Sequence, residues 1–350
     1  MAIGYGNSYL PCLAMVSVQA CYTGMNIICK LALESKMSPL VLVAYRQTFA
    51  TLALAPFAYW MEWDTRPQIT MPILFQIFLC SLSGATANHI FYFVGLNETS
   101  PIIVSAVGNT LPALTFILAV LFRQESATMK NKAGLAKVMG TVVCISGAMI
   151  LAFYHGTIIE IGESKIHWSY AQKLRESSAA GNNANSFVGP ILIVISALGW
   201  AIWFNIQAKV SVMFPAPYTS TALMCFMASL ECGLIAVCVE HNRHAWALTN
   251  PMRLTASLYT GIMGSAVAFF LTSWCIQRKG PLYVSVFNPL LLIFVAVSSW
   301  ALLHEKLYLG TAIGSILIVV GLYTVLWGKR KEKAKLETNP NATLELQLPK

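Results

Sequence analysis

The sequence contains few charged residues. Asp, Glu, Lys and Arg make up 11% of its 350 residues, whereas hydrophobic residues make up 57%. A soluble globular domain has roughly 25% charged residues. A chain of this composition lacks the polar groups needed to cover a water-exposed surface. This excludes a soluble globular protein and predicts that most side chains face lipid or other buried helices.

Motifs for catalysis, metal binding and nucleotide binding are also missing. The sequence has no GxSxG and no P-loop, and no histidine follows His304-Glu305 at the spacing of HExxH. The 9 cysteines form no CxxC pair and lie in apolar stretches, so we interpret them as small buried hydrophobes. The net charge of +9 comes without a basic face interleaved with aromatic residues, which argues against nucleic-acid binding. We therefore expect no enzyme activity, no cofactor, no metal and no nucleic-acid partner.

Long apolar runs dominate the chain instead. A helix needs about 20 apolar residues to cross a hydrocarbon core roughly 30 Å thick, and ten segments have this character. The sequence therefore predicts an all-α membrane protein with ten transmembrane helices in a lipid bilayer. The predicted spans are Tyr9–Leu31, Pro39–Trp60, Met71–Gly95, Pro101–Phe122, Ala133–Tyr154, Gly189–Lys209, Pro217–Val239, Leu254–Ile276, Pro281–Leu303 and Leu307–Trp327.

The distribution of basic residues predicts the orientation. When the N-terminus is placed in the cytoplasm, most Lys and Arg residues, including the run Lys329–Lys335, fall on the cytoplasmic side. Both termini are then cytoplasmic. The polar stretch 155–188 becomes an extracytoplasmic linker, and residues 328–350 are predicted from their composition to be a disordered cytoplasmic tail.

The two halves of the chain repeat each other. Gly84 falls on Gly264 at an offset of 180 residues, and Asn26 falls on Asn205 at an offset of 179. Five spans in each half is an odd number, so the second half must insert with the opposite orientation. The sequence thus predicts two inverted repeats, 9–154 and 189–327, that face each other across the membrane. Many secondary transporters have this architecture.

Several short motifs, in a fixed order, point to a family. They are Met37-Ser38-Pro39, Val43-Ala44-Tyr45-Arg46, Thr86-Ala87-Asn88, Leu111-Pro112-Ala113, Phe287-Asn288-Pro289 and Gly321-Leu322-Tyr323. From about residue 10 to residue 329 the chain resembles the plant nodulin-21-like, or walls-are-thin-related, transporters of the drug/metabolite transporter superfamily. This resemblance implies two inverted five-helix EamA repeats.

The resemblance also implies a function. It implies facilitated or proton-linked movement of amino acids, with auxin or other small metabolites as substrates of some members. His89 stands where many relatives have Gln, a departure that weakens any transfer of substrate from the family. We expect a plasma-membrane location, with the vacuolar membrane as the alternative.

Polar side chains within the apolar spans are the candidates for substrate contact, because they are costly in hydrocarbon unless they are paired or face a cavity. Arg46 in the second span can bind a substrate carboxylate with two hydrogen bonds; alternatively it forms a structural ion pair or snorkels to the interface. Glu231 in the seventh span can carry a coupling proton, bind an amino group or pair with Arg46. His89 can change charge near neutral pH or act as a hydrogen-bonded core residue.

Asparagines form a second group of candidates. Asn26 and Asn205 occupy equivalent places in the two halves, and an amide offers a donor and an acceptor to a zwitterion. The alternative is hydrogen bonding between helices. Asn88 follows Gly84, where close packing or local unwinding can expose the backbone to a cavity.

Two further pairs complete the set. Asn109 and Asn288 lie in matching spans, each close to a proline. A proline kink can line a pathway or be purely structural. Trp203 and Trp274 lie inside spans, where an indole ring can stack on a substrate or pack in the core.

These features together predict a secondary transporter. We expect it to move small organic solutes, amino acids first, by alternating access around a midplane site between the repeats. Auxin (indole-3-acetate) or another metabolite is the alternative substrate. A non-transporting membrane sensor, a channel and an intramembrane enzyme are further alternatives, which explain the inverted duplication less well.

Overall fold

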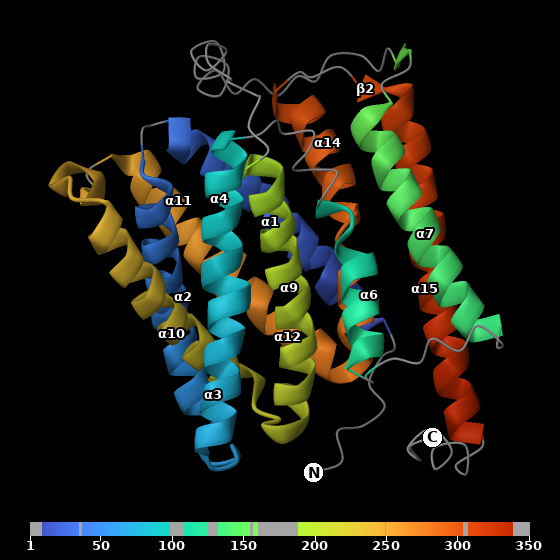
Figure 1. Cartoon of the computed structure of the whole chain (residues 1–350), viewed down its shortest axis with the longest axis horizontal. Coiled ribbons are helices and arrows are strands. Elements are labelled where there is room, and N and C mark those ends of the chain that lie inside the picture. Colours follow the sequence, from blue (N-terminus) through green and yellow to red (C-terminus); the bar gives the residue numbers. More distant parts are fainter. Residues whose placement is uncertain are drawn as a thin grey trace.

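The structure, a computed structural model, is built almost entirely from helices (Figure 1). It describes residues 9–34, 37–98, 108–122, 124, 132–154, 157–159, 188–248, 250–303 and 307–338. The first half contains α1 (Leu10–Glu34), α2 (Pro39–Glu62), α3 (Met71–Cys80), the π-helix η1 (Ser81–Ala87), α4 (Asn88–Glu98), α6 (Leu111–Leu121) and α7 (Lys132–Phe153).

The second half repeats this order. It contains α9 (Val188–Met213), α10 (Pro217–Val239), the 3₁₀ turn η2 (Arg243–Trp246), α11 (Pro251–Gly261), the π-helix η3 (Ile262–Val267), α12 (Ala268–Lys279), α13 (Pro281–Ser285), α14 (Leu290–Leu303) and α15 (Leu309–Thr338). Two-residue strands β1 (Ile158–Ile159) and β2 (Leu307–Tyr308) pair in antiparallel fashion.

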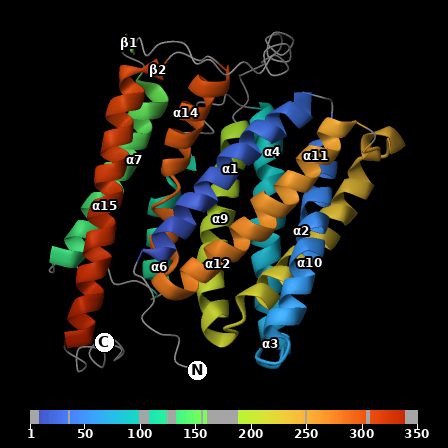
Figure 2. The ribbon, with the colours of Figure 1, turned by 180° about the vertical axis from the view of Figure 1, so that it is seen from behind.

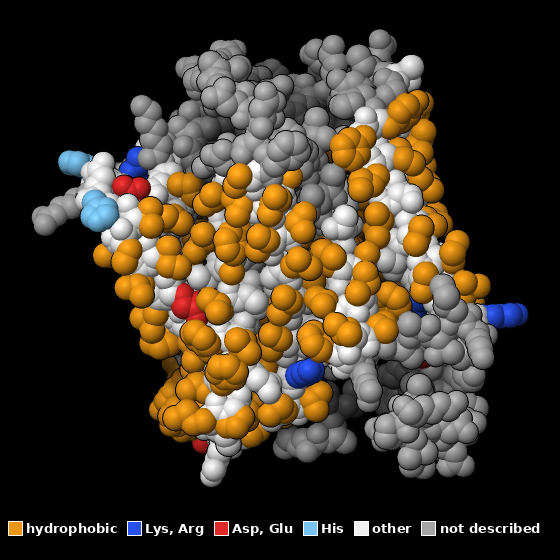
Figure 3. All heavy atoms as spheres, in the orientation of Figure 1, with side chains coloured by type: hydrophobic (Ala, Val, Ile, Leu, Met, Phe, Trp, Pro, Cys, Tyr) orange, Lys and Arg blue, Asp and Glu red, His pale blue; other side chains and the backbone are white. Residues whose placement is uncertain are grey.

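The helices have the length and polarity of membrane spans. Among the described residues, 9 helical segments are long and apolar enough to cross a membrane, and α6 is a shorter apolar helix. Residues 101–107, where the fourth predicted span begins, lie outside the described part. Hydrophobic side chains cover most of the described surface in Figure 3. The predicted all-α membrane fold is confirmed.

Proline and glycine set several helix ends. A proline occupies the first or second position of α2, α10, α11 and α13. The N–H groups at these positions have no acceptor within the helix, so a residue that lacks an N–H is tolerated there. Gly280 ends α12 with a φ of 85°. This left-handed conformation favours glycine, and it lets α13 start directly afterwards at Pro281.

The two halves are inverted copies that pack around a pseudo-two-fold axis. Contacts between helices come in equivalent pairs: α9 packs on α3 and α4 as α1 packs on α11 and α12, and α10 packs on η1 as α2 packs on η3. Figure 2 shows α1 beside α12, and Figure 1 shows α9 beside α4. The pairs α2–α10 and α7–α15 are each formed by equivalent helices. The inverted repeat predicted from the sequence is therefore confirmed.

The C-terminal region departs from the prediction. Helix α15 continues to Thr338, so the prediction that the polar tail is disordered from residue 328 is wrong for residues 328–338. This segment is rich in Lys and Glu, which are good helix formers. Lys137 on α7 also forms an ion pair with Glu332 at 2.8 Å. Residues 339–350, and most of the predicted linker 155–188, lie outside the described residues.

Candidate functional site

Both π-helices lie at the same place in their repeats. The offset of 180 residues that superposes Gly84 on Gly264 also superposes η1 on η3, and each lies midway along its span. A π-helical segment shifts the backbone hydrogen bonds of a helix and is frequent at functional sites. Close packing or local unwinding was expected at Gly84; the structure has a π-helix there, with Gly84 packed closely against Trp203, and a second π-helix in the equivalent place.

Arg46 extends from α2 of the first repeat to η3 of the second. Its Nε donates to Ser265 Oγ at 2.6 Å, and its Nη2 donates to the main-chain oxygen of Gly264 at 3.0 Å. The residue is only 2% exposed, and its guanidinium lies 5.9 Å from the ring centroid of Phe269. Arg46 is therefore held in the interior between the repeats and does not snorkel to an interface.

Glu231 makes the reciprocal contact. It lies on α10 of the second repeat and accepts hydrogen bonds from Ser81 Oγ and Thr86 Oγ1, both at 2.5 Å, at the two ends of η1. It forms no ion pair with Arg46 in the described part of the chain. Cys232, next to Glu231, places its Sγ 3.5 Å from Oγ1 of Thr86, the same hydroxyl that binds Glu231.

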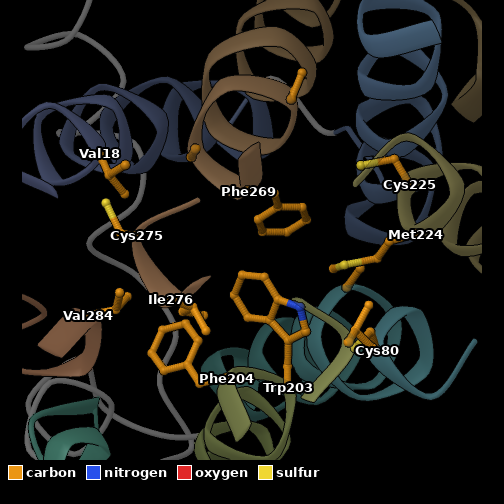
Figure 4. Close-up of a cluster of buried hydrophobic side chains, with 14 of the residues drawn as sticks. Val18, Cys80, Trp203, Phe204, Met224, Cys225, Phe269, Cys275, Ile276 and Val284 are labelled. Carbon is orange, nitrogen blue, oxygen red and sulfur yellow. The ribbon is translucent and has the colours of Figure 1, made fainter. Parts of the chain in front are cut away.

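Aromatic rings fill the space between the π-helices. Trp200 lies at their centre, with ring centroids 6.2 Å from Tyr22, 5.9 Å from His89, 5.1 Å from Trp203 and 6.0 Å from Phe269. Figure 4 shows Trp203 and Phe269 next to each other, flanked by Phe204 and Ile276 on one side and by Met224 and Cys80 on the other. The rings give the site an apolar wall that comes from both repeats.

Two buried side chains, one next to Arg46 in the sequence and one in this wall, have polar atoms without a described partner. Gln47 follows Arg46 in α2, and neither its amide oxygen nor its amide nitrogen has a hydrogen-bond partner among the described residues. The same holds for Nε1 of Trp203, which packs against Gly84. Leaving such a group unsatisfied costs about 1–3 kcal/mol, and polar groups within membrane spans mark substrate pathways. The arrangement resembles a ligand site, in which a few polar groups converge within apolar walls.

A second polar feature lies on the pseudo-two-fold axis. Asn288 Nδ2 donates to the main-chain oxygen of Gly108 at 3.3 Å, and these residues are 180 positions apart. Because they are equivalent in the two repeats, their contact must lie close to the axis. The ninth span is interrupted here between α13 and α14, and buried Asn109 beside the contact leaves its Nδ2 without a described partner. Discontinuous helices of this kind surround midplane sites in transporters.

Two predicted asparagines instead form hydrogen bonds within a helix or between helices. Asn205 is fully buried, and its Nδ2 donates to the main-chain oxygen of Ala201 at 2.8 Å. Asn88 Nδ2 donates to the main-chain oxygen and to Oγ of Ser196, both at 2.9 Å. These contacts are hydrogen bonds within α9 and between α4 and α9. The other member of the first pair, Asn26, is half-buried on α1.

Of the remaining predicted residues, His89 and Trp203 lie together in the aromatic wall, whereas Trp274 lies apart from it. His89 is buried in the aromatic wall, where its Nδ1 lies 2.8 Å from the main-chain oxygen of Ala85. Trp203 lies in the same wall. Trp274 instead lies close to the end of α12, where Arg278 covers its ring at 4.2 Å.

Some residues of the site were not anticipated. The two charged side chains bind three small polar residues, Ser81, Thr86 and Ser265. Each of these lies close in sequence to Gly84 or Gly264, the glycines that align between the repeats. That proximity was a usable signal. Trp200 and Phe269 gave none, because an aromatic residue that lines a site has the same sequence pattern as one that packs in a core.

Comparison with known proteins identifies the family. A model of the EamA-like transporter family matches residues 10–153 and 187–327. This chain belongs to the EamA-like transporter family. It is 38% identical to Protein WALLS ARE THIN 1 of Arabidopsis thaliana, over 92% of this chain and 83% of that protein. It is likewise 38% identical to the WAT1-related protein At5g07050 of Arabidopsis thaliana, over 96% of this chain and 87% of that protein.

A comparison with solved structures finds the same fold. One crystal structure superposes with a TM-score of 0.67 and 14% sequence identity, over 91% of this chain and 98% of that chain. At that identity the likeness shows the fold alone. As a member of the EamA-like family, the chain is a multi-pass membrane transporter.

Proposed function

We propose that the protein is a secondary transporter of small organic acids, with amino acids as its first substrates. The observation that carries the proposal is Arg46, a buried cation between the repeats that forms no ion pair with a described residue. A guanidinium has five N–H donors, and the described partners of Arg46 are neutral. A substrate carboxylate would supply the missing negative charge, with a geometry that a guanidinium matches well.

An α-amino acid would use both reciprocal contacts. Its carboxylate would bind Arg46, and its ammonium group would face the neighbourhood of Glu231, which also holds Cys232 and Thr86. Gln47 would add a donor and an acceptor. The π-helices η1 and η3 and the interruption between α13 and α14 would let the bundles rock around this point, giving alternating access.

A specific observation supports indole-3-acetate as a second candidate substrate. The rings of Trp200, Trp203 and Phe269 meet edge-on or tilted, and the ring of Phe269 lies 5.9 Å from the guanidinium of Arg46. An aryl acid could place its ring against this wall and its carboxylate on the guanidinium. The carboxylate contact is common to both candidates, whereas the aromatic contact favours only aryl substrates.

Reconstituted vesicles test the proposal. Purified protein is placed in liposomes loaded with labelled amino acids, indole-3-acetate or its neutral analogue indole-3-acetamide, and efflux is followed with and without a pH gradient. A charged hydrogen bond contributes about 1.5–3 kcal/mol, so Arg46→Gln should slow efflux of the acids about 10- to 100-fold more than efflux of the amide. Arg278→Gln, which removes an exposed arginine at the end of α12, serves as the matched control and should leave the ratio unchanged. Equal losses for the acids and the amide would assign Arg46 a structural role.

The membrane and the orientation belong to the same proposal. The excess of basic residues supports cytoplasmic termini, with the plasma membrane as the first location and the vacuolar membrane as the second. A fluorescent fusion locates the membrane. Protease access to a C-terminal tag in intact and permeabilised cells determines the side.

A further inference from the structure

A cavity of about 410 Å³ lies on the face where α2 and α11 begin and where α10 ends. Ser38 lines it from the connection between α1 and α2. Glu240, Asn242 and His244 line it from the connection between α10 and α11, and Arg253 lines it from α11. This face is opposite the one where α12 and α15 end (Figure 1). The cavity is therefore separate from the site between the π-helices.

The lining of the cavity suits a zwitterion. Glu240 and Arg253 bring opposite charges to one space, and Ser38 and Asn242 add neutral hydrogen-bonding groups. Pockets for small molecules have volumes of roughly 300–1,000 Å³, so this cavity has room for a free α-amino acid. An α-amino acid carries one carboxylate for Arg253 and one ammonium group for Glu240.

The cavity lies above the two charged residues of the central site. Arg46 follows Pro39, which lines the cavity, by seven residues in α2, and Glu231 precedes the end of α10 by eight. At 1.5 Å per residue these separations are about 10–12 Å along the helices. A substrate leaving the cavity along α2 and α10 would thus have to travel about 10–12 Å to reach Arg46.

Trp246 of η2 stands between the two sites. Its main-chain oxygen accepts a hydrogen bond from the hydroxyl of Tyr45 at 2.8 Å, and the two rings lie edge to face at 5.9 Å. Tyr45 directly precedes Arg46. The indole also packs against two buried clusters, one containing Cys29 and the other Cys232. The ring of Trp246 therefore fills space between the connection that lines the cavity and the buried residues next to Arg46.

We infer that this cavity is an outer binding site that holds a zwitterionic α-amino acid before it reaches Arg46, with Trp246 as the gate between them. The inference rests on the proposed function for its ligand. Contacts to exposed charges are weak, so the outer site raises the local concentration of substrate and affects transport from one face only. That sidedness separates a binding role from a role in folding, which would act on transport from both faces.

Oriented proteoliposomes test the binding site. The KM for a labelled zwitterionic amino acid is measured from the cavity face and from the opposite face, for wild type, Arg253→Gln and Glu240→Gln. Each variant should raise the KM from the cavity face about two- to fivefold, as expected for an exposed charge contact, and leave the other KM unchanged. His241→Gln, in the same connection but outside the cavity lining, should change neither.

Thiol labelling tests the gate without depending on transport. Cys238 is exposed near the same end of α10, so the experiment uses a Cys238→Ser background. In Trp246→Ala, a membrane-impermeant maleimide added from the cavity face should label Cys29 and Cys232, which are buried, at least tenfold faster than when Trp246 is present.

The outcomes separate the two proposals. Wild-type protein that moves no amino acid refutes the proposed function and, with it, the ligand of the outer site. If wild type transports, a KM in Arg253→Gln that is unchanged, or raised equally from both faces, overturns the outer site. Equal labelling rates with and without Trp246 overturn the gate.

Discussion

Replacing Gly84 by alanine should destabilise the protein, because Trp203 occupies the space beside it. An added Cβ would lie 2.7 Å from Cβ and 2.8 Å from Cδ2 of Trp203, which is far inside van der Waals contact. Trp203 is fully buried between η1 and Phe269, so its ring cannot swing away into open space. The methyl group must therefore push α9 and η1 apart.

Two other glycines set the scale of this effect. Overpacking of a core costs about 1–3 kcal/mol, partly offset by the better helix propensity of alanine, about 1 kcal/mol. At Gly264 the nearest atom to an added Cβ is Sδ of Met25 at 2.8 Å, and a methionine side chain can adapt its shape. At Gly233 nothing lies within 4 Å. We therefore expect Gly84→Ala to lose about 1–2 kcal/mol, Gly264→Ala to lose less, and Gly233→Ala to gain up to about 1 kcal/mol.

Thermal unfolding of the purified variants in detergent measures this order. One kcal/mol corresponds to roughly 2–4 °C in a domain of 150–250 residues, so Gly84→Ala should melt several degrees below Gly233→Ala. Replacing Trp203 by Phe in the Gly84→Ala background should recover part of the loss, because the two sites are in contact and their effects do not add. A Gly84→Ala protein that melts with or above Gly233→Ala would refute the close packing between η1 and α9.

Three further outcomes follow from individual contacts. Glu231→Gln keeps the shape of the side chain but removes its charge. In vesicles this variant should lose any effect of a pH gradient on transport, while exchange without a gradient continues. If the variant responds to the gradient as strongly as the wild type does, Glu231 has no role in proton coupling. Glu62→Ala removes a carboxylate that accepts the main-chain N–H groups of Tyr218 and Thr219 at 3.0 and 2.7 Å, and the unfolding temperature should fall by the equivalent of about 1–2 kcal/mol, with Glu62→Gln falling less. Asn288→Ala removes an interhelical hydrogen bond of a kind worth about 0.6 kcal/mol in membrane proteins, so it should hardly change the unfolding temperature; a fall of several degrees would show that the bond holds the repeats together.

The fold could be predicted from the sequence because its signals are long and redundant. Ten apolar runs and the match of Gly84 with Gly264 leave few arrangements other than an inverted pair of helical bundles. The π-helices and the interruption after α13 were less accessible. Their glycines and prolines mark irregular backbone, but an apolar run has the same composition whether its backbone is α-helical or π-helical.

The site could be predicted only in part. Arg46 and Glu231 stand out because a charge within an apolar span needs a specific reason. Their partners could not be assigned, since Arg46 binds residues more than 200 positions away and Glu231 binds residues about 150 positions away. An ion pair between Arg46 and Glu231 was one of several alternatives left open by the sequence. In the structure each of these side chains instead binds the π-helix of the opposite repeat.

The reciprocal contacts of η1 and η3 have a consequence for the energetics of the cycle. If the repeats were identical, the conformation open to one face and the conformation open to the other would be related by a two-fold rotation and would have equal free energy in a symmetric bilayer. Both repeats contain the π-helix, but η1 binds the carboxylate of Glu231, whereas η3 binds the guanidinium of Arg46. Because the repeats differ in sequence, Arg46 and Glu231 among the differences, no symmetry requires the two conformations to have equal free energy.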